Sequence, residues 1–282
     1  MKRFVKWCLI LTGVLLAVGI GLRVAGAVMG GRAESNSYYA QRWNDFSGHW
    51  GDFSHHWPLG GLLGETQTKD SGAINDPISA IDVDVDCGDI MLRQGECFSV
   101  YMEWNLRGFT LDYEVEDGVL KVESDSKSGF LNGVSGWKNE VTITVPVWAM
   151  LDKIDLSTNL GDVDVDVDAI FMVDEADLAT NLGDVSCGNG MDARKLTAET
   201  DLGDVKVSLL WGKENYRWEL ETDLGKVSMD GETLTSAKLQ SGKGTDRVEA
   251  RSSLGDVSVR FGSGLRPETT WAFPTSGSLK HG

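Results

Sequence analysis

The sequence predicts an all-β domain, built as a β-solenoid or β-helix-like stack of coils about 20 to 22 residues long and preceded by one transmembrane helix. Three observations predict it. A six-residue motif recurs at a nearly constant interval. Polar and apolar residues alternate on both sides of a glycine in that motif. A long apolar run follows a basic N-terminus.

The repeated motif is Thr-Asn-Leu-Gly-Asp-Val or a close variant of it. Its copies begin at Thr158, Thr180, Thr200, Thr222 and Ser252. The glycines of the first four copies are 22, 20 and 22 residues apart, and periods of this size are typical of solenoids. The sequence therefore predicts stacked structural repeats.

Each copy consists of two strands that meet at a corner. Before Gly161 the apolar residues occupy even positions, and from Val163 they occupy odd positions, so both segments have the period of a half-buried strand. In this interpretation the motif leucine, such as Leu160, points inward, and Cys87 takes its place in an earlier copy. Glycine suits the corner because it adopts backbone angles denied to other residues. The predicted corner residues are Gly88, Asp89, Gly161, Asp162, Gly183, Asp184, Gly203, Asp204, Gly225, Lys226, Gly255 and Asp256.

Two regions depart from the repeat. Between Gly88 and Gly161 lies an inserted hairpin region, in which Asp117-Gly118 predicts a tight turn and Pro146 ends a strand. A further hairpin is expected at Gln94-Gly95; it would place Cys97 opposite Leu92, so a disulfide with Cys87 is not favoured. Between Gly225 and Gly255 the template fits a segment with Lys243 at the leucine position, which predicts a shortened coil or an opened corner.

Residues 1–32 are expected to form a signal anchor with a cytoplasmic N-terminus. The run from Trp7 to Leu22 is apolar and follows basic residues. Cleavage near Ala25-Gly26-Ala27 is the alternative, and either case predicts export of the rest of the chain. Small residues recur every four positions and suggest a homodimer through the helix face, although such residues are common in membrane helices. They are Gly13, Ala17, Gly21 and Ala25.

Residues 33–77 are expected to be a juxtamembrane aromatic segment and linker. Aromatic residues from Tyr39 to Trp57 follow a helical spacing, which fits either a helix at the membrane interface or a flexible linker. Residues 58–77 are interpreted as linker. Residues 78–262 form the repeat domain, and residues 263–282 form a tail or terminal coil.

The net charge of −17 argues against nucleic acid as a partner, because nucleic acid binds basic surfaces. Coils stacked in chain order would place Asp155 beside Asp177 and Glu199 beside Glu221, and mutually repelling carboxylates could bind Ca²⁺ weakly. Splayed, solvated carboxylates are the alternative. The residues of this possible cation wall are Asp155, Asp177, Glu199, Asp201, Glu221 and Asp223. No cofactor and no dedicated metal site is predicted.

The copies D-C-G-D-I, T-N-L-G-D-V and T-D-L-G-D-V, the G-V-L-K-V hairpin and the I-T-V-P strand end resemble a bacterial family of β-strand-repeat proteins. This family is a domain of unknown function labelled "putative adhesin", and the resemblance covers roughly residues 79–262. It implies a β-helix-like fold in a cell-envelope protein and supplies no catalytic residues. A non-catalytic surface-binding module is therefore expected, with an envelope-stress or signalling accessory and a glycan-active enzyme as alternatives. The ligand is not predicted.

Overall fold

The computed structural model describes residues 63–126, 138–188, 190–234 and 237–266, which all belong to the compact unit Gly61–Gly282. The expected anchor, its dimer face and the aromatic segment lie outside these residues. No helix in the described part of the chain has the length and apolarity needed to cross a membrane.

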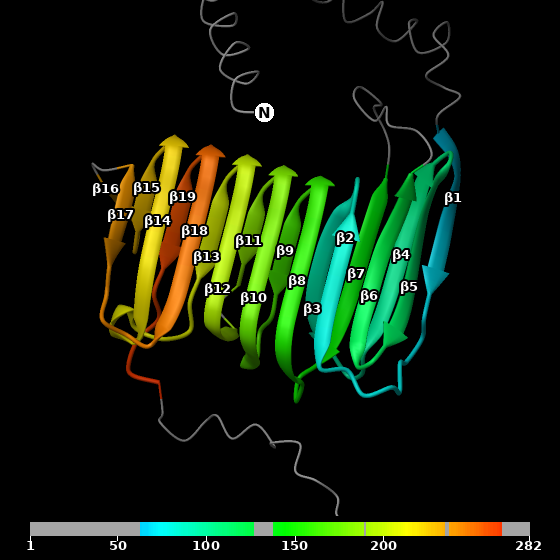
Figure 1. Ribbon diagram of the computed structural model, residues 1–282, viewed down its shortest axis with the longest axis horizontal. Helices are drawn as coiled ribbons and strands as arrows, with labels where there is room; N and C mark the ends of the chain where they lie inside the picture. The colour runs from blue at the N-terminus through cyan, green and yellow to red at the C-terminus, as the bar shows by residue number, and fades with distance from the viewer. Residues whose placement is uncertain (1–62, 127–137, 189, 235–236, 267–282) are drawn as a thin grey trace, which may run out of the picture. The chain divides into compact units, whose positions relative to one another are not determined.

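The strands form two sheets, seen one in front of the other in Figure 1. The ten-stranded sheet has the order β1 (Leu63–Asp70), β4 (Ser99–Leu106), β7 (Asn139–Pro146), β3 (Asp89–Gly95), β9 (Val163–Asp166), β11 (Val185–Cys187), β13 (Val205–Ser208), β19 (Val257–Arg260), β15 (Val227–Met229) and β16 (Glu232–Leu234). The nine-stranded sheet has the order β17 (Lys238–Ser241), β14 (Tyr216–Leu224), β18 (Asp246–Leu254), β12 (Met191–Leu202), β10 (Phe171–Leu182), β8 (Met150–Leu160), β2 (Ala80–Val85), β6 (Val119–Ser126) and β5 (Phe109–Glu116).

Each coil contributes one strand to each sheet, as in β8–β9, β10–β11 and β12–β13. Neighbouring coils are parallel and in register, so that Ile154 pairs with Ala176, which in turn pairs with Leu196. The predicted all-β repeat architecture is confirmed at this level. The repeat alternation produces it because every copy offers the same inward face at the same position.

The order of the coils differs from the order of the chain at both ends of the stack. The last coil, β18–β19, lies between β12–β13 and β14–β15. The first coil, β2–β3, lies between the strands β6 and β7 on one side and the coil β8–β9 on the other. Stacking in chain order, the basis of the predicted carboxylate columns, is therefore wrong at the β18 position. The motif specifies a face and a corner, but it is too uniform to specify which copy is the neighbour.

The inserted region gives one correct and one incorrect hairpin. Asp117 and Gly118 have φ angles of 51° and 80°, and they join the antiparallel strands β5 and β6 as predicted. The hairpin at Gln94-Gly95 does not form, because β7 lies between β3 and β4 and pairs with both. Cys87 and Cys97 are free thiols. Burial raises the pKa of Cys87 to about 11, as expected for a thiol that acts as a small apolar side chain.

Two further predictions fail at the margins of the domain. The segment expected to be linker contains β1, which pairs with β4 at the edge of the larger sheet. The irregular repeat is not a coil, because β17 turns back and runs antiparallel to β14, leaving Lys243 exposed beyond its end. β17 covers the backbone groups that β14, the outermost parallel strand of its sheet, would otherwise expose, and β1 covers the free edge of the antiparallel strand β4.

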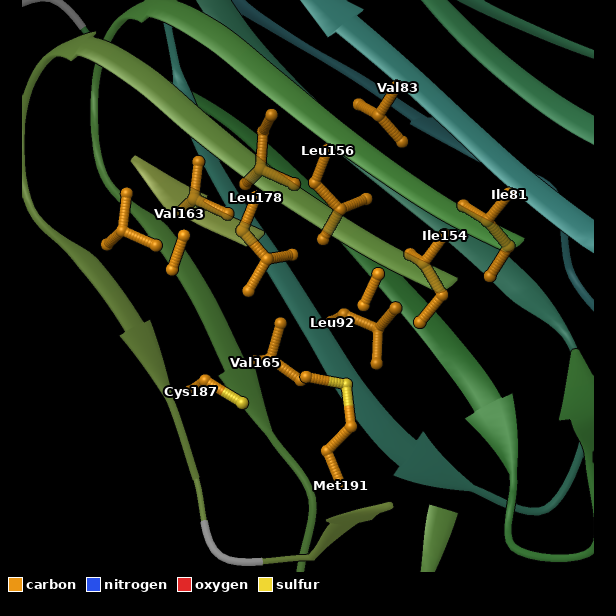
Figure 2. Packing of buried hydrophobic residues seen from close by; sticks show 14 of the residues in the cluster. Ile81, Val83, Leu92, Ile154, Leu156, Val163, Val165, Leu178, Cys187 and Met191 are labelled. Atoms are coloured by element: carbon orange, nitrogen blue, oxygen red, sulfur yellow. The ribbon is translucent and has the colours of Figure 1, made fainter. Parts of the chain in front are cut away.

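The core lies between the two sheets and is lined by alternate residues of every coil (Figure 2). Val83, Leu156 and Leu178 come from one sheet, Val163 and Val165 come from the other, and all are at most 1% exposed. Side chains at equivalent positions of successive coils stack at the strand spacing of about 4.8 Å.

A buried ionic cluster ties the C-terminal segment to the strand starts at the edge opposite the corners. Arg266 contacts both Asp192 of β12 and Asp246 of β18, the latter at 2.6 Å. Asp192 is fully buried and Asp246 is 6% exposed, while the Arg266 side chain is 11% exposed. Burial raises the pKa of Asp246, and the neighbouring Arg266 opposes that shift. The arginine thus compensates the charges of two carboxylates that are buried almost completely.

Candidate functional site

The corner edge, where five motif copies turn from one sheet to the other, is the most regular surface of the domain. Five corner glycines have φ angles of 145° to 155°, a region that favours glycine: Gly88, Gly161, Gly183, Gly203 and Gly255. The coils also meet closely there. A Cβ on Gly203 would lie 1.9 Å from the carbonyl oxygen of Gly183, and one on Gly225 would lie 1.9 Å from that of Gly255.

The corner aspartates form a ladder along this edge. Each one accepts a hydrogen bond, at its Oδ1, from the backbone N–H of the next corner residue, over 2.7 to 3.0 Å. The ladder runs through Asp89, Asp162, Asp184, Asp204, Asp256 and Lys226. Lys226 belongs to the last coil of the ladder, where no further backbone N–H of a described coil requires an acceptor, so this residue contributes only its own backbone N–H. This structural role explains why Asp recurs at every corner but that one.

A second ladder lies just inside the corner. The motif hydroxyl donates to the glycine carbonyl of the adjacent coil over 2.8 to 3.0 Å in all five copies, and these side chains are only 2% to 5% exposed. The donors are Thr158, Thr180, Thr200, Ser252 and Thr222. The hydroxyls therefore link each coil to the next at the point of closest approach.

We expect Thr200→Val to destabilise the domain by about 1–2 kcal/mol, because it removes a buried hydrogen bond while keeping the side-chain shape. The Gly183 carbonyl would lose its hydroxyl donor. Thr197→Val, at a partly exposed position on the same strand, is the control and should change stability by less than about 0.5 kcal/mol. Urea unfolding of both variants measures the difference, and equal values would rule out the ladder as a stabilising element.

The motif leucines do not point into the core, contrary to the sequence interpretation. Leu182, Leu202 and Leu254 are 46% to 48% exposed, Leu224 is 69% exposed and Leu160 is partly exposed. The inward register ends at the buried hydroxyl residue because the chain then turns over the rim of the core. Cys87, at the equivalent position, is buried beside Asn139, whose side chain donates to the Cys87 carbonyl.

These five leucines form a continuous apolar row, which we call the leucine ridge. The pairing of the coils places them in the order Leu160, Leu182, Leu202, Leu254 and Leu224. Sequence reasoning missed the ridge because it assigned every regularly repeated apolar residue to the core. The available signal was that each leucine lies between polar residues and directly before a corner glycine.

Polar rows and two shallow depressions accompany the ridge. One depression, beside Leu160 and Leu182, is also lined by Asp89, Glu140 and Asp162. The other lies on the outer face near the corner, between Asp201 and Asp223, where the small Ser253 occupies the intervening strand. Carboxylates outnumber cations among the described residues of both depressions, since Lys138 is the one cation lining the first and Arg251 the one lining the second.

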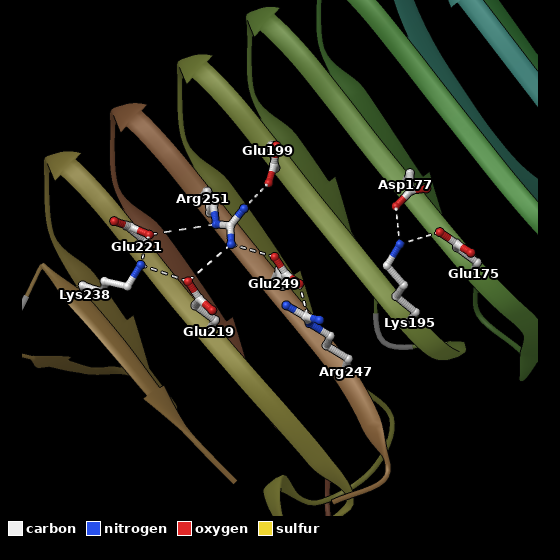
Figure 3. A network of polar contacts seen from close by, with 10 residues as sticks. All are labelled: Glu175, Asp177, Lys195, Glu199, Glu219, Glu221, Lys238, Arg247, Glu249 and Arg251. Atoms are coloured by element: carbon white, nitrogen blue, oxygen red, sulfur yellow. Dashed lines mark hydrogen bonds and ion pairs between the residues drawn. The ribbon is translucent and has the colours of Figure 1, made fainter.

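The outer face of the nine-stranded sheet is not the bare acidic wall that the sequence suggested (Figure 3). Arg251 of β18 lies between Glu199 and Glu221, which are not neighbours, and its guanidinium contacts Glu199 at 3.0 Å and Glu249 at 2.7 Å. Asp155 and Asp177 are adjacent as predicted, but Lys153 contacts both of them. Interleaved cations therefore offset much of the expected repulsion.

We expect Arg251→Gln to destabilise the protein by about 1 kcal/mol at low ionic strength, equivalent to about 3 °C in Tm. The loss should shrink in 0.5 M NaCl, since salt screens the repulsion among the carboxylates left behind. Lys213→Gln, at an exposed position in the short helix η2 (Lys213–Asn215), is the control. Thermal melts at both salt concentrations test this, and an unchanged difference in high salt would contradict it.

The described residues contain no group of three or more His, Cys, Asp or Glu side chains placed to hold a metal ion. The four histidines lie outside the described residues. The remaining members of the possible cation wall, Asp201 and Asp223, flank Ser253 rather than each other. Whether they bind Ca²⁺ weakly stays a prediction.

Comparison with known proteins places this geometry in a family. No curated protein matches the chain. Among solved structures, a "putative cell adhesion protein" from Clostridium sporogenes is similar over 70% of this chain and 99% of its own, with 14% identity and a TM-score of 0.48. A "putative adhesin" from Bacteroides fragilis covers 70% of this chain and 96% of its own, with 15% identity and a TM-score of 0.32.

A further structure, a "putative lipid binding protein" from Parabacteroides distasonis, covers 71% of this chain and 97% of its own, with 14% identity and a TM-score of 0.22. The sequence match is the stronger finding, since it spans residues 78–264 and so includes all five stacked motif copies and the corner that they share. The resemblance to the β-strand-repeat family is thereby confirmed, and the chain belongs to the Toastrack DUF4097 family.

Proposed function

We propose that the chain is a non-catalytic binding module of the bacterial cell envelope, anchored by its N-terminal helix and displaying its repeat domain outside the membrane. The leucine ridge is the observation that carries this proposal. Soluble domains rarely leave a contiguous apolar row in water, and such rows often mark interaction sites. The ridge is 46% to 69% exposed at four of its five leucines.

The chemistry of the corner edge favours binding over catalysis. Its repeated aspartates each accept a backbone N–H from the next coil, so their recurrence has a structural cause. The repeated hydroxyls donate to backbone carbonyls in the same way and are buried. What remains exposed is a regular apolar row bordered by carboxylates, which suits recognition of another surface.

Display outside the cell is tested in bacteria that produce the full chain. The protein should remain in the membrane pellet after alkaline carbonate washing, and protease added to intact cells should degrade the repeat domain. Release of a soluble species that begins near Val28 would instead show that the N-terminal segment is a cleaved signal peptide and not an anchor. Protection of the repeat domain in intact cells, with digestion only after lysis, would contradict external display.

Use of the ridge as a binding surface is tested by a photo-crosslinking residue placed at Leu202. Irradiation of intact cells should give discrete adducts that are absent when the same residue replaces Ile170. Ile170 is a matched control because it is 49% exposed, close to the 48% of Leu202, and lies in the loop before β10 at the opposite edge. The same adducts from both positions would contradict a specific surface.

A further inference from the structure

We propose that the leucine ridge docks one class of partner, a cationic amphipathic α-helix of about four turns. This inference rests on the proposed function and names the partner for its binding surface. It comes from the spacing of the ridge, the charges beside it and the depressions that flank it.

The spacing of the ridge matches the pitch of a helix. Five leucines on adjacent coils, from Leu160 to Leu224, span four strand spacings, or about 19 Å. An α-helix that lies along the ridge presents apolar side chains once per turn, every 5.4 Å. Over four repeats the two spacings drift apart by only about 2 Å, which flexible leucine side chains can absorb.

The charges beside the ridge are predominantly negative. One flank carries the corner residues Asp162, Asp184, Asp204, Asp256 and Lys226. The other flank carries Asn159, Asn181, Asp201, Ser253 and Asp223. Lys206 contacts Asp184 at 3.3 Å and Asp204 at 3.5 Å, so the edge presents six carboxylates against two lysines.

The unpaired carboxylates lie where a docked helix would place its flanking residues. Asp201 and Asp223 are exposed and have no ion-pair partner within the described part of the chain. They border the depression on the outer face near the corner, in which Arg251 is the one cation among the described lining residues, against four carboxylates. A second depression beside Leu160 contains Asp89 and Glu140. Lysine or arginine side chains that flank the apolar stripe of a helix would enter these depressions and meet carboxylates.

The same charges disfavour the other occupants of an apolar row. A second copy of this chain would bring carboxylate rows against carboxylate rows, which costs free energy at close range. An anionic lipid surface would be repelled likewise. An uncharged apolar partner would cover Asp201 and Asp223 without providing a positive charge to compensate their negative charges. A helix with an apolar stripe between basic residues satisfies both features of the edge.

The test uses the full chain in phosphatidylcholine nanodiscs and a fluorescent synthetic peptide of about 14 leucine and lysine residues, patterned as an amphipathic helix. Fluorescence anisotropy should show saturable binding above that of empty nanodiscs. A peptide with glutamate in place of lysine, and a scrambled leucine–lysine peptide, should bind at least tenfold more weakly. Equal binding of all three peptides would overturn the proposal.

The double variant Leu202→Ser/Leu254→Ser should weaken binding at least tenfold. The control, Val147→Ser/Ile170→Ser, removes side chains of 53% and 49% exposure at the opposite edge and should stay within twofold of wild type. Both double variants replace exposed residues, and thermal melts that match the wild-type melt are needed to establish that each variant is folded. Equal weakening by both would overturn the proposal.

Two further outcomes would assign the ridge to another occupant and overturn the proposal. One is self-association of the full chain that is lost in the Leu202→Ser/Leu254→Ser variant. The other is ridge-dependent binding to phosphatidylglycerol nanodiscs in the absence of peptide. Failure of external display in cells would contradict the proposed function, whereas peptide binding by the ridge could still be measured. The two proposals can therefore be refuted independently.

Discussion

Gly203→Ala is expected to destabilise the repeat domain by about 4 kcal/mol, which is exceptional for the addition of one methyl group. Two causes act together at this corner. The φ angle of 150° is strained for any residue with a Cβ, and that Cβ would lie 1.9 Å from the Gly183 carbonyl oxygen. The oxygen belongs to the adjacent coil, which is held by its own ladders and cannot move independently.

A second glycine separates strain from collision. Gly231 has a φ angle of 86°, but no atom lies within 4 Å of the position that a Cβ would take, so Gly231→Ala carries only the backbone strain of about 1–2 kcal/mol. Urea denaturation of both variants should therefore show the corner substitution to be the more damaging by at least about 2 kcal/mol. Equal losses would mean that the coils do not approach as closely as the corner geometry requires.

The strands and corners were predictable from the sequence because they depend on short-range patterns. Alternation before and after Gly161 identifies two strands with one inward face each, and the turn chemistry of Asp117-Gly118 identifies a hairpin. Both signals lie within a few residues of the structure that they specify. The order of the coils depends instead on long-range pairing between nearly identical motifs.

The insertion of β18–β19 between β12–β13 and β14–β15 shows this limit. Thr200 and Thr222 occupy equivalent positions in their motifs, and both pair with Ser252. No local sequence signal indicates that the copy at Ser252 lies between the other two. Outward side chains give the one retrospective hint. Arg251 occupies the strand position that Glu199 and Glu221 occupy in their own coils. Its placement between them removes the charge repulsion that the two glutamates would have if the coils stacked in chain order.

The leucine ridge was not predicted because the sequence interpretation continued the alternation of buried residues for two residues beyond the last buried position of each strand. Thr158 and Leu160 share strand parity, and only the position of the corner decides that the first is buried and the second lies on the rim. The hydroxyl ladder explains why the last inward residue is polar. It donates to a carbonyl of the adjacent coil, so its burial leaves no unsatisfied group.

Arg266→Met is the second substitution with a large expected effect, a loss of about 3–5 kcal/mol at neutral pH. Methionine replaces the aliphatic part of the arginine side chain but leaves the buried Asp192 and Asp246 without a cation. Lys206→Met, which removes an ion pair at a side chain that is 57% exposed, is the control and should cost less than about 1 kcal/mol. Chemical denaturation at pH 7 compares the two.

The pH dependence distinguishes an uncompensated charge from simple loss of packing. Burial raises the folded-state pKa of Asp246 above its ordinary value, and Arg266 opposes this shift, so Arg266→Met should raise that pKa further. A raised carboxyl pKa makes the folded state bind protons more tightly, so its contribution to stability is fully present below the unfolded pKa and is lost as pH rises through the folded pKa. The gap between wild type and Arg266→Met should therefore be small near pH 3 and widen toward pH 7. Adding Asp246→Asn to Arg266→Met should recover part of the loss at pH 7, and a gap that is independent of pH would show that Arg266 acts only by packing.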